Sequence, residues 1–434
     1  MSAPDRLYLF EDRVARSWAP FALTRPVGEL MVGARLLRER AELAWGRPCS
    51  GYLGATELAG FHEEAAPPVL AATREPHGDG PTVLLSSRVM WARDPTGAPA
   101  PPPATREALE AGHNRTLVVE ETVVGWILSP GASLPSTELL AEPRILEDAA
   151  PLALSGAVLE RPWDLLRHQP EQLMEDLAEL ATGTPDETDW HVLGKDAPLP
   201  EGVSRIGNHP LIVGPEVVLE PGVSVDLRHG PVALGREVEV RSFTRLEGPT
   251  YVGPYSMLLG GPLSRVSAGP VSRLRGEVSD SILLGYTNKA HDGYLGHSVV
   301  GRWVNLGAGT TNSDLKNNYG TVRVRTPEGD QDTGLIKVGC FLGDHVKTAI
   351  GTLLGTGAVV GAGANLFGGT PVGRCVPPFA WGIAGTSAYQ VDRFVDTART
   401  AMARRGVELS TGAEELLRRA WHRSRPPRER ASGR

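Results

Sequence analysis

Cysteine is scarce in this 434-residue sequence. The three cysteines, Cys49, Cys340 and Cys375, are odd in number and do not have the spacing of metal ligands. This usage does not fit a disulfide-stapled secreted domain or a cysteine-ligated metal site, and it fits a reducing compartment. Long apolar runs are absent too, and the start (M-S-A-P-D-R) does not read as a signal peptide. We therefore expect a cytoplasmic protein with no membrane partner.

Basic residues do not outnumber acidic ones. Lys+Arg 44 against Asp+Glu 51 gives a net charge of −7, so no global field attracts nucleic acid. Lysine is especially rare, because only five of the 44 basic residues are lysine and four of these lie between 289 and 347. Such a cluster indicates positions that need a compact, flexible ammonium. Chance and local surface composition would also explain it.

The first part of the chain has the pattern of an α/β domain. Apolar segments at 7–10, 51–54, 69–72, 82–85, 117–119 and 123–128 alternate with polar or helical stretches, including an amphipathic helix through Arg40. The run 95–104 is proline-rich and is expected to be a surface loop. We expect this domain over 1–160, followed by a helical linker over 161–200 whose helix covers most of 162–181.

From about residue 203 a six-residue repeat replaces the helices. Its clearest run of lead residues is Leu342, Thr348, Leu354, Val360, Leu366 and Val372. Small or β-branched residues follow four positions later: Val346, Thr352, Ala358, Ala364, Thr370 and Val376. This pattern predicts a left-handed parallel β-helix with about six residues per face, over 201–386.

Two further segments depart from the repeat. Residues 311–335 break the period with a polar insertion, and such insertions usually lie on a working face. Residues 387–421 read as one or two amphipathic helices with Gly412 near the break, and 422–434 as a basic, disordered tail.

The stretch 288–320 gathers histidine, lysine, tyrosine and asparagine side chains among glycines. It reads N-K-A-H-D-G-Y-L-G-H-S-V-V-G-R-W-V-N-L-G-A-G-T-T-N-S-D-L-K-N-N-Y-G. It resembles the acetyltransferase half of bacterial bifunctional N-acetylglucosamine-1-phosphate uridyltransferase/glucosamine-1-phosphate acetyltransferases. In that family the stretch is approximately K-A-G-H-x-x-Y-L-G, then V-N-I-G-A-G-T, then N-Y-D-G. The resemblance implies acyl transfer from acetyl-CoA to an amino-sugar 1-phosphate.

His291 and Asn305 are the candidate catalytic residues. An amine that attacks a thioester must lose a proton, and a histidine that titrates near neutrality is the natural acceptor. Asn305 can contact the sugar or the developing oxyanion. A surface histidine and an asparagine that only stabilises a β-helix corner are the structural alternatives.

The remaining candidates are contacts to the substrates. Charge and hydroxyl contacts to the sugar phosphate are expected from Lys289, Tyr294, Lys316, Asn318, Tyr319 and Arg245. The resemblance places the acyl-CoA arm near Ala308, Asp344 and Ala362. Two family positions are altered, because G-E-V-S-D-S (276–281) stands where the family has a lysine and R-L-E-G-P (245–249) replaces R-L-R-P-G. Arg245, Arg273 or Arg275 could take over those phosphate contacts.

The N-terminal half resembles sugar-nucleotide pyrophosphorylases, through S-W-A-P-F-A-L-T-R-P-V-G-E-L (17–30). With L-F-E-D and P-W-D-L-L, the whole chain is similar to a divergent family of sugar nucleotidyltransferases fused to the same β-helix. The pyrophosphorylase glycine turn is replaced by F-E-D-R-V-A-R (10–16), its lysine by Val27 and its Gly-Asp pair by Ser86-Ser87. Either this half uses Mg²⁺ and a nucleoside triphosphate, or it is a degenerate ligand-binding or assembly domain. In the first case, charge contacts to the triphosphate and the metal are expected from Asp12, Arg13, Arg16, Arg25 and Glu29.

The leading hypothesis is therefore a cytoplasmic bifunctional enzyme of UDP-N-acetylglucosamine biosynthesis for the cell envelope. It would acetylate an amino-sugar 1-phosphate, with glucosamine 1-phosphate the expected acceptor, and transfer a nucleotidyl group from UTP. One alternative is a sugar-1-phosphate nucleotidyltransferase with a structural β-helix. Another is a non-catalytic sugar-nucleotide-binding regulatory protein. β-Helix acyltransferases of this type imply a homotrimer with shared sites.

Overall fold

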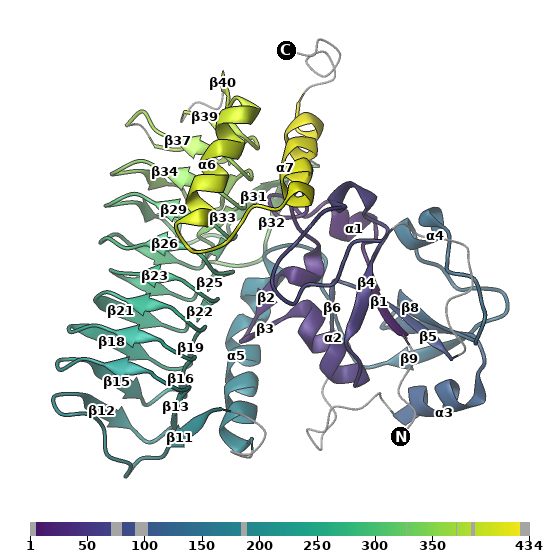
Figure 1. Cartoon of the computed structure of the whole chain (residues 1–434), viewed down its shortest axis with the longest axis horizontal. Coiled ribbons are helices and arrows are strands. Elements are labelled where there is room, and N and C mark those ends of the chain that lie inside the picture. Colours follow the sequence, from purple (N-terminus) through teal and green to yellow (C-terminus); the bar gives the residue numbers. More distant parts are fainter. Residues whose placement is uncertain are drawn as a thin grey trace.

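The computed structural model describes residues 6–70, 80–91, 103–183, 189–326, 328–369, 371–382 and 387–425. An α/β domain comes first, a triangular prism of β-strands follows, and two helices complete the described chain (Figure 1). The α/β domain lies along a flank of the prism, and α6 and α7 lie beside its last coils (Figure 1). The predicted fold class, an α/β domain followed by a left-handed parallel β-helix and C-terminal helices, is confirmed.

A six-stranded sheet forms the centre of the α/β domain. Its order is β4 (Cys49–Leu53), β1 (Arg6–Phe10), β5 (Thr82–Ser86), β8 (Thr122–Leu128), β7 (Arg115–Val119) and β9 (Ala150–Leu154). β4, β1 and β5 are parallel, and β8 is antiparallel to β5. Leu7 and Leu9 join one hydrophobic cluster, whereas Tyr8 and Phe10 join another, because successive strand residues point to opposite faces. The strands expected near 7–10, 51–54, 82–85, 117–119 and 123–128 are confirmed.

Short elements surround this sheet. They are α1 (Arg13–Arg16), η1 (Val27–Glu29), β2 (Met31–Val32), β3 (Arg35–Leu36), α2 (Leu37–Trp45), η2 (Thr56–Leu58), β6 (Val89–Trp91), α3 (Pro103–Ala111), α4 (Thr137–Ala141) and β10 (Gly156–Val158). The amphipathic helix expected through Arg40 is α2, which is followed by Gly46, a residue with a φ of 63°. Most of the proline-rich run 95–104, and 71–72 of the apolar segment 69–72, lie outside the described residues.

Helix α5 (Asp164–Thr182) runs between the α/β domain and the prism and confirms the helix expected within 162–181 (Figure 1). Leu173 and Leu177 pack in one cluster with Ile212 and Ala233 of the prism. The Nε2 of Gln169 donates a hydrogen bond to the hydroxyl of Ser267. The helix therefore attaches the first domain to the side of the solenoid.

Three sheets form the faces of the prism. The domain face consists of β11 (His191–Leu193), β13 (Leu211–Val213), β16 (Val232–Leu234), β19 (Thr250–Val252), β22 (Ser267–Ala268), β25 (Ile282–Leu283), β28 (Val299–Val300), β33 (Cys340–Leu342), β36 (Ala358–Val360) and β38 (Cys375–Val376). The helix face consists of β14 (Val218–Leu219), β17 (Glu239–Val240), β20 (Met257–Leu258), β23 (Arg273–Leu274), β26 (Asn288–Lys289), β29 (Asn305–Leu306), β34 (Lys347–Thr348), β37 (Asn365–Leu366), β39 (Ala380–Trp381) and β40 (Ser387–Ala388). The open face consists of β12 (Ser204–Gly207), β15 (Ser224–Leu227), β18 (Thr244–Glu247), β21 (Gly261–Ser264), β24 (Val278–Ser279) and β27 (Leu295–Gly296).

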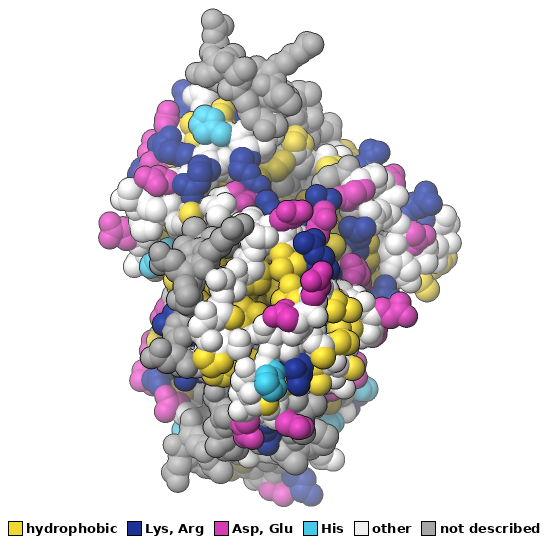
Figure 2. Space-filling view, turned by 90° about the vertical axis from the view of Figure 1, so that its right-hand side faces the viewer, with side chains coloured by type: hydrophobic (Ala, Val, Ile, Leu, Met, Phe, Trp, Pro, Cys, Tyr) yellow, Lys and Arg dark blue, Asp and Glu magenta, His cyan; other side chains and the backbone are white. Residues whose placement is uncertain are grey.

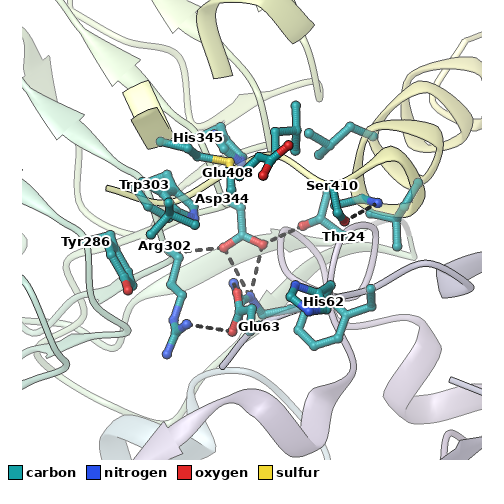
Figure 3. A pocket seen from close by; sticks show the side chains of 18 of the residues that line it. Thr24, His62, Glu63, Tyr286, Arg302, Trp303, Asp344, His345, Glu408 and Ser410 are labelled. Carbon is teal, nitrogen blue, oxygen red and sulfur yellow. Dashed lines mark hydrogen bonds and ion pairs between the residues drawn. The ribbon is translucent and has the colours of Figure 1, made fainter. Parts of the chain in front are cut away.

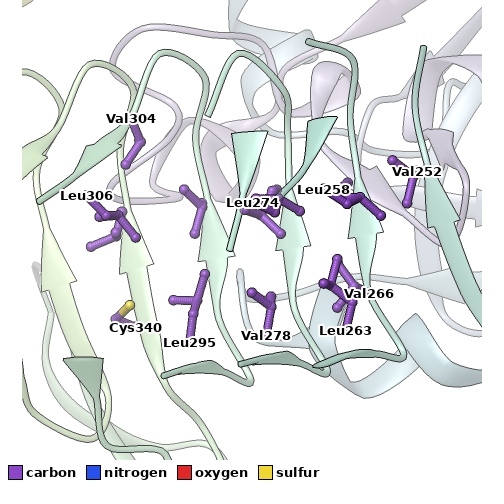
Figure 4. Close-up of a cluster of buried hydrophobic side chains, with 14 of the residues drawn as sticks. Val252, Leu258, Leu263, Val266, Leu274, Val278, Leu295, Val304, Leu306 and Cys340 are labelled. Carbon is purple, nitrogen blue, oxygen red and sulfur yellow. The ribbon is translucent and has the colours of Figure 1, made fainter. Parts of the chain in front are cut away.

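Aliphatic side chains fill the prism from coil to coil (Figure 4). Leu342, Leu354, Val360, Leu366 and Val372 of the predicted repeat all belong to this core. The corner between the domain face and the helix face has a residue in the left-handed conformation in successive coils, with φ values of 52° at Tyr286, 63° at Trp303 and 60° at His345. Such a conformation costs roughly 1–2 kcal/mol for a non-glycine residue, so the stacked coils must stabilise it.

The polar insertion has a structural partner. Its hairpin consists of β31 (Arg323–Thr326) and β32 (Gly329–Asp332), and β30 (Thr311–Asn312) pairs with β35 (Leu353–Leu354) at its start. Val322 and Val324 are buried in a cluster with Trp18 and Leu159 of the α/β domain. The insertion thus helps to hold the two domains together.

The C-terminal segment forms two helices, which is one of the two possibilities predicted from the sequence. They are α6 (Val391–Ala403) and α7 (Thr411–Arg423). The break precedes Gly412, because Gly406 has a φ of 73° and the Ser410 side chain caps α7 by accepting from the Ala413 N–H. Residues 426–434 of the predicted tail lie outside the described residues.

The flank formed by the α/β domain has hydrophobic side chains near its centre, with acidic and basic side chains interspersed around them (Figure 2). This face has no broad surface of one charge sign. Within the described part of the chain, no helix is long and apolar enough to cross a membrane.

Candidate functional site

The turn that carries His291 forms the corner between the helix face and the open face. It follows β26 and precedes β27, and the His291 side chain is exposed. The next coil stacks on it, since the Gly309 N–H donates to the Asp292 carbonyl at 2.9 Å. Ala308 therefore lies in the neighbouring corner, beside the His291 turn. The structure brings these two predicted residues together.

Lys289 supports this turn from inside the prism. The side chain is 2% exposed, and its Nζ donates to the carbonyls of Arg275, His291 and Gly293 at 2.6, 3.2 and 2.7 Å. Burial lowers the pKa of Lys289 to about 8. This position differs from the expected contact with a sugar phosphate, because three carbonyl groups already occupy the ammonium. In this structure Lys289 positions the His291 turn.

A cluster that the sequence prediction missed lies on the next part of the coil. The hydroxyl of Tyr294 donates to Asp314 Oδ2 at 2.7 Å, and Nδ1 of His297 lies 2.7 Å from the same oxygen. Nε2 of His297 lies 3.7 Å from Asp280. Both ring nitrogens thus face carboxylates, so neither is directed at an open substrate site. The presence of His297 and Asp314 within 288–320 was the signal that could have identified them.

Asn305 belongs to a row of aligned side chains on the helix face. β23, β26, β29 and β34 pair so that Arg273, Asn288, Asn305 and Lys347 occupy matching positions in successive coils. The Nδ2 of Asn288 donates to Oδ1 of Asn305 at 2.8 Å. This contact is the one expected if Asn305 only stabilises the β-helix. Its own amide N–H groups make no hydrogen bond within the described residues and can donate to a ligand.

The other predicted sugar-phosphate contacts lie on the open-face sheet and in the polar insertion. Arg245 pairs with Asp226 and Glu247 on β18, three strands from β27 in the open-face sheet. Lys316, Asn318 and Tyr319 lie in the insertion, where Nζ of Lys316 donates to the Thr321 carbonyl at 3.0 Å. Tyr319 is 72% exposed. Arg275 is nearer to the His291 turn, since its Nε donates to Asp292 at 3.1 Å.

Arg25 and Asp344 meet each other across the domain boundary (Figure 3). The Arg25 Nε donates to Asp344 Oδ2 at 3.0 Å, and its Nη2 donates to Glu63 at 2.7 Å. Thr24 and the Arg302 N–H also donate to Asp344, at 2.7 and 2.8 Å. Burial alone would lower the pKa of Arg25, but Asp344 and Glu63 raise it above its ordinary value. Arg25 and Asp344, which were both expected to contact ligands, thus belong to one buried ion-pair network.

A cavity of about 440 Å³ adjoins this network. It lies where the α/β domain, a prism corner and the α6–α7 segment meet, and its lining includes Phe61, Tyr286, Trp303 and Leu416 (Figure 3). Ala362, predicted to lie along the acyl-CoA arm, is 1% exposed. Asp344 and Ala362 occupy the corner between the domain and helix faces, whereas Ala308 occupies the corner with His291. The structure therefore separates Ala308 from Asp344 and Ala362 among the three residues predicted for acyl-CoA.

His345 lines this cavity with a buried imidazole. It is 7% exposed, its Nδ1 has no hydrogen-bond partner, and burial, with Lys347 and Arg25 nearby, lowers its pKa to about 3. The unfolded chain binds a proton near pH 6.5 and the folded chain does not, so stability should fall as pH falls from 6.5 towards 3. At pH 5 we expect a loss of about 2 kcal/mol relative to pH 7.

Urea unfolding of His345→Asn at both pH values checks this prediction, because asparagine tolerates the left-handed corner and does not titrate. The variant should lose most of this pH dependence, whereas His229→Asn, at an exposed prism histidine, should keep it. An unchanged pH dependence in His345→Asn would assign the acid sensitivity to other groups.

In the α/β domain, the carboxyl ends of β1 and β5 converge where a parallel sheet usually binds its ligand. Glu11 accepts from the Val27 N–H at 3.1 Å, and burial raises its pKa to about 7. Asp12 caps α1 through Ala15 and pairs with Arg88 at 2.7 Å. These two carboxylates, as arranged, do not fit a Mg²⁺ ion. No group of three or more His, Cys, Asp or Glu suited to a metal occurs in the part of the chain described.

The other charges expected at a triphosphate also have internal partners. Arg13 is exposed and pairs with Glu142 at 3.0 Å, and Arg16 pairs with Glu57 at 3.0 Å. Glu29 accepts from Arg38 and from the Tyr52 hydroxyl, both at 2.7 Å. Arg13 and Arg25, which were expected at the triphosphate, thus both pair with carboxylates of the protein.

Comparison with known proteins confirms the resemblance found in the sequence. Residues 7–184 match the model of a family described as sugar nucleotidyl transferase. The chain is 31% identical over 159 residues to a bifunctional sugar-1-phosphate nucleotidylyltransferase/acetyltransferase of Sulfurisphaera tokodaii, covering 34% of this chain and 38% of that protein. It is 26% identical over 227 residues to the bifunctional protein GlmU of Nocardia farcinica, covering 52% of this chain and 40% of the relative. For GlmU of Xanthomonas axonopodis pv. citri the identity is 28% over 189 residues, covering 42% and 37%. The matches thus span about two fifths of each relative's length.

Proposed function

We propose that the chain is a transferase acting on sugar phosphates, because residues 7–184 match the model of a family described as sugar nucleotidyl transferase. Its main activity is acetyl transfer from acetyl-CoA to an amino-sugar 1-phosphate, with glucosamine 1-phosphate as the expected acceptor. The observation that carries this proposal is the exposed His291 on a turn fixed by Lys289, one coil from Asn305 and Ala308.

The chemistry requires few groups. The amine nitrogen attacks the thioester carbonyl carbon, the C–N bond forms, His291 accepts the amine proton, and the C–S bond breaks to release CoA. A positioned base contributes about 10²–10⁴ in rate. The amide of Asn305 donates to the oxyanion that develops at the carbonyl oxygen, which is where a fixed donor is most effective.

We further propose that the catalytic unit is a homotrimer. The His291 side chain is exposed on an edge of the prism, which supports a site completed by a neighbouring copy. The molar mass in solution, measured by light scattering, tests this part of the proposal, and a monomer would contradict it.

Nucleotidyl transfer from UTP to the acetylated product is the second candidate function, supported by the family match over 7–184. Against it, Glu11, Asp12 and Arg25 are engaged within the protein. Because the arrangement of the two carboxylates does not fit Mg²⁺, no step is assigned to that ion. A domain that binds a sugar nucleotide without reacting would keep the same contacts.

Product analysis by mass spectrometry tests both functions. The protein is incubated with glucosamine 1-phosphate, acetyl-CoA, UTP and Mg²⁺, and parallel reactions omit one component each. We expect free CoA and an N-acetylated sugar phosphate whenever both acetyl-transfer substrates are present. Pyrophosphate and a UDP-sugar would establish the second activity, and their absence with several sugar phosphates and nucleotides would favour the binding role. Absence of acetylated product with every amino-sugar phosphate would refute the main proposal.

A further inference from the structure

A second cavity lies between the prism and helix α6. Its volume is about 530 Å³, within the range of small-molecule sites. On one side it is lined by the aligned row Arg273, Asn288, Asn305 and Lys347 of the helix face. Neighbouring strands of a sheet are roughly 4.8 Å apart, so this row is about 14 Å long. It has a cationic side chain at each end and two amide side chains between them.

Helix α6 supplies the opposite wall. Asp396, Thr400 and Arg404 line the cavity at intervals of four residues, and Arg405 follows the helix end. Residues four apart lie on the same side of a helix, so one polar side of α6 faces the prism. Figure 1 shows α6 lying beside β29 and β34, the strands that carry Asn305 and Lys347. The cavity is therefore closed by a segment far along the chain from the His291 turn.

Positive charge dominates this cavity. Four cationic side chains face one carboxylate, Asp396, which is 73% exposed and pairs with Arg399 at 2.8 Å. Within the residues the structure describes, Arg273, Lys347 and Arg404 form no ion pair, and Arg405 only approaches Asn288 Oδ1 at 3.4 Å.

The pKa values of Lys347 and Arg405 are consistent with positive charge that no carboxylate compensates. Burial lowers the pKa of Lys347 to about 8, and burial with the neighbouring Arg273 and Arg404 lowers that of Arg405. An anion within the cavity would relieve this repulsion.

Helix stability alone does not explain the arrangement. Arginines at the end of α6 interact favourably with the helix dipole, which accounts for Arg404 and Arg405. It does not account for Arg273 and Lys347, which come from the prism and line the same cavity. Lys347 is also one of only five lysines in the chain, where arginine is the usual cation.

We propose that this helix-face cavity binds a phosphorylated substrate, whose phosphate is held by the cationic side chains of the lining: Arg273 and Lys347 at the two ends of the prism row, and Arg404 and Arg405 directly after α6. The proposal rests on the proposed function, because it assigns the phosphate to one of the acetyl-transfer substrates. Both the amino-sugar phosphate and CoA carry such a group. In either case α6 acts as a wall of the site and not only as a cap of the prism.

Isothermal titration calorimetry on the full chain tests the assignment. The ligands are inorganic phosphate, glucosamine 1-phosphate, CoA and dephospho-CoA, which lacks the 3′-phosphate. The variants are Lys347→Gln, Arg404→Gln and the double variant, and Arg393→Gln is the matched control on an exposed part of α6. A lost charge-assisted hydrogen bond corresponds to an affinity loss of about tenfold to a hundredfold, so each single variant should weaken phosphate binding by that factor.

The ligand series identifies the source of the phosphate. Loss of glucosamine 1-phosphate affinity in the variants, with CoA affinity unchanged, assigns the cavity to the sugar phosphate. If instead wild type prefers CoA to dephospho-CoA and the variants do not, the cavity takes the CoA phosphate. Wild-type affinities for all four ligands in the folded double variant, with folding checked by circular dichroism, would overturn the proposal.

The proposed function and this site can fail separately. A protein that binds phosphate through Lys347 and Arg404 but never releases CoA retains the site and refutes acetyl transfer. A protein whose acetyl transfer keeps the same KM for both substrates in the double variant retains the function and refutes the site.

Discussion

His291→Ala is expected to lower the kcat of acetyl transfer by about 10²–10⁴-fold, because the attacking amine would lose its proton acceptor. The side chain is exposed and the turn is held by Lys289 through backbone carbonyls, so the substitution should leave the fold intact. The release of CoA with glucosamine 1-phosphate, followed with a thiol reagent, measures the effect. The thermal unfolding temperature should not change.

Two other histidines make the test specific. His229→Ala removes an exposed histidine of the same prism and should keep full activity. His297→Ala removes the imidazole that lies between Asp314 and Asp280, and it should affect stability more than the chemical step. If His297→Ala abolishes turnover while His291→Ala reacts at the wild-type rate, the base has been assigned to the wrong residue.

Arg25→Met should destabilise the protein by about 3–5 kcal/mol, which is typical when one partner of a buried ion pair is removed. The reason is that Asp344 and Glu63 would keep their charges in the junction without the guanidinium that compensates them. The α/β domain and the prism share this network, so the loss should appear as separation of the two parts at lower urea concentration. Urea unfolding followed by tryptophan fluorescence measures it.

Arg13→Met is the matched control. Its pair with Glu142 is exposed, and surface ion pairs contribute roughly 0–1 kcal/mol. A combined Arg25→Met and Asp344→Asn variant should recover part of the loss, since one of the stranded charges is removed. An Arg25→Met protein as stable as wild type would mean that the junction depends on its hydrophobic cluster alone.

The periodic parts of the fold could be predicted from the sequence. Leu342, Leu354 and Val360 follow the six-residue repeat because each fills the equivalent interior position of one face of the prism, and this local rule is visible in the sequence. The strand at 7–10 and the helix within 162–181 follow from similarly local patterns. The turn with His291 was located because the stretch 288–320 gathers polar side chains among glycines and resembles an acetyltransferase motif.

Contacts between distant segments could not be predicted in this way. Arg25 and Asp344 are 319 positions apart, and nothing near either residue indicates that they form an ion pair. The same holds for Arg404, which meets Lys347 in one cavity only because α6 folds back on the prism. Lys289 looked like a ligand contact because a buried ammonium that serves backbone carbonyls has no distinguishing sequence pattern.

Lateral attachment of the α/β domain restricts how copies of this chain can assemble. In a triangular prism the edge with His291, between the helix face and the open face, lies opposite the domain face. In the proposed homotrimer, an arrangement that turns the three imidazole-bearing edges inward would carry the α/β domains on the periphery. Each inward edge would then border a neighbour, so that substrates would enter along the seams between protomers.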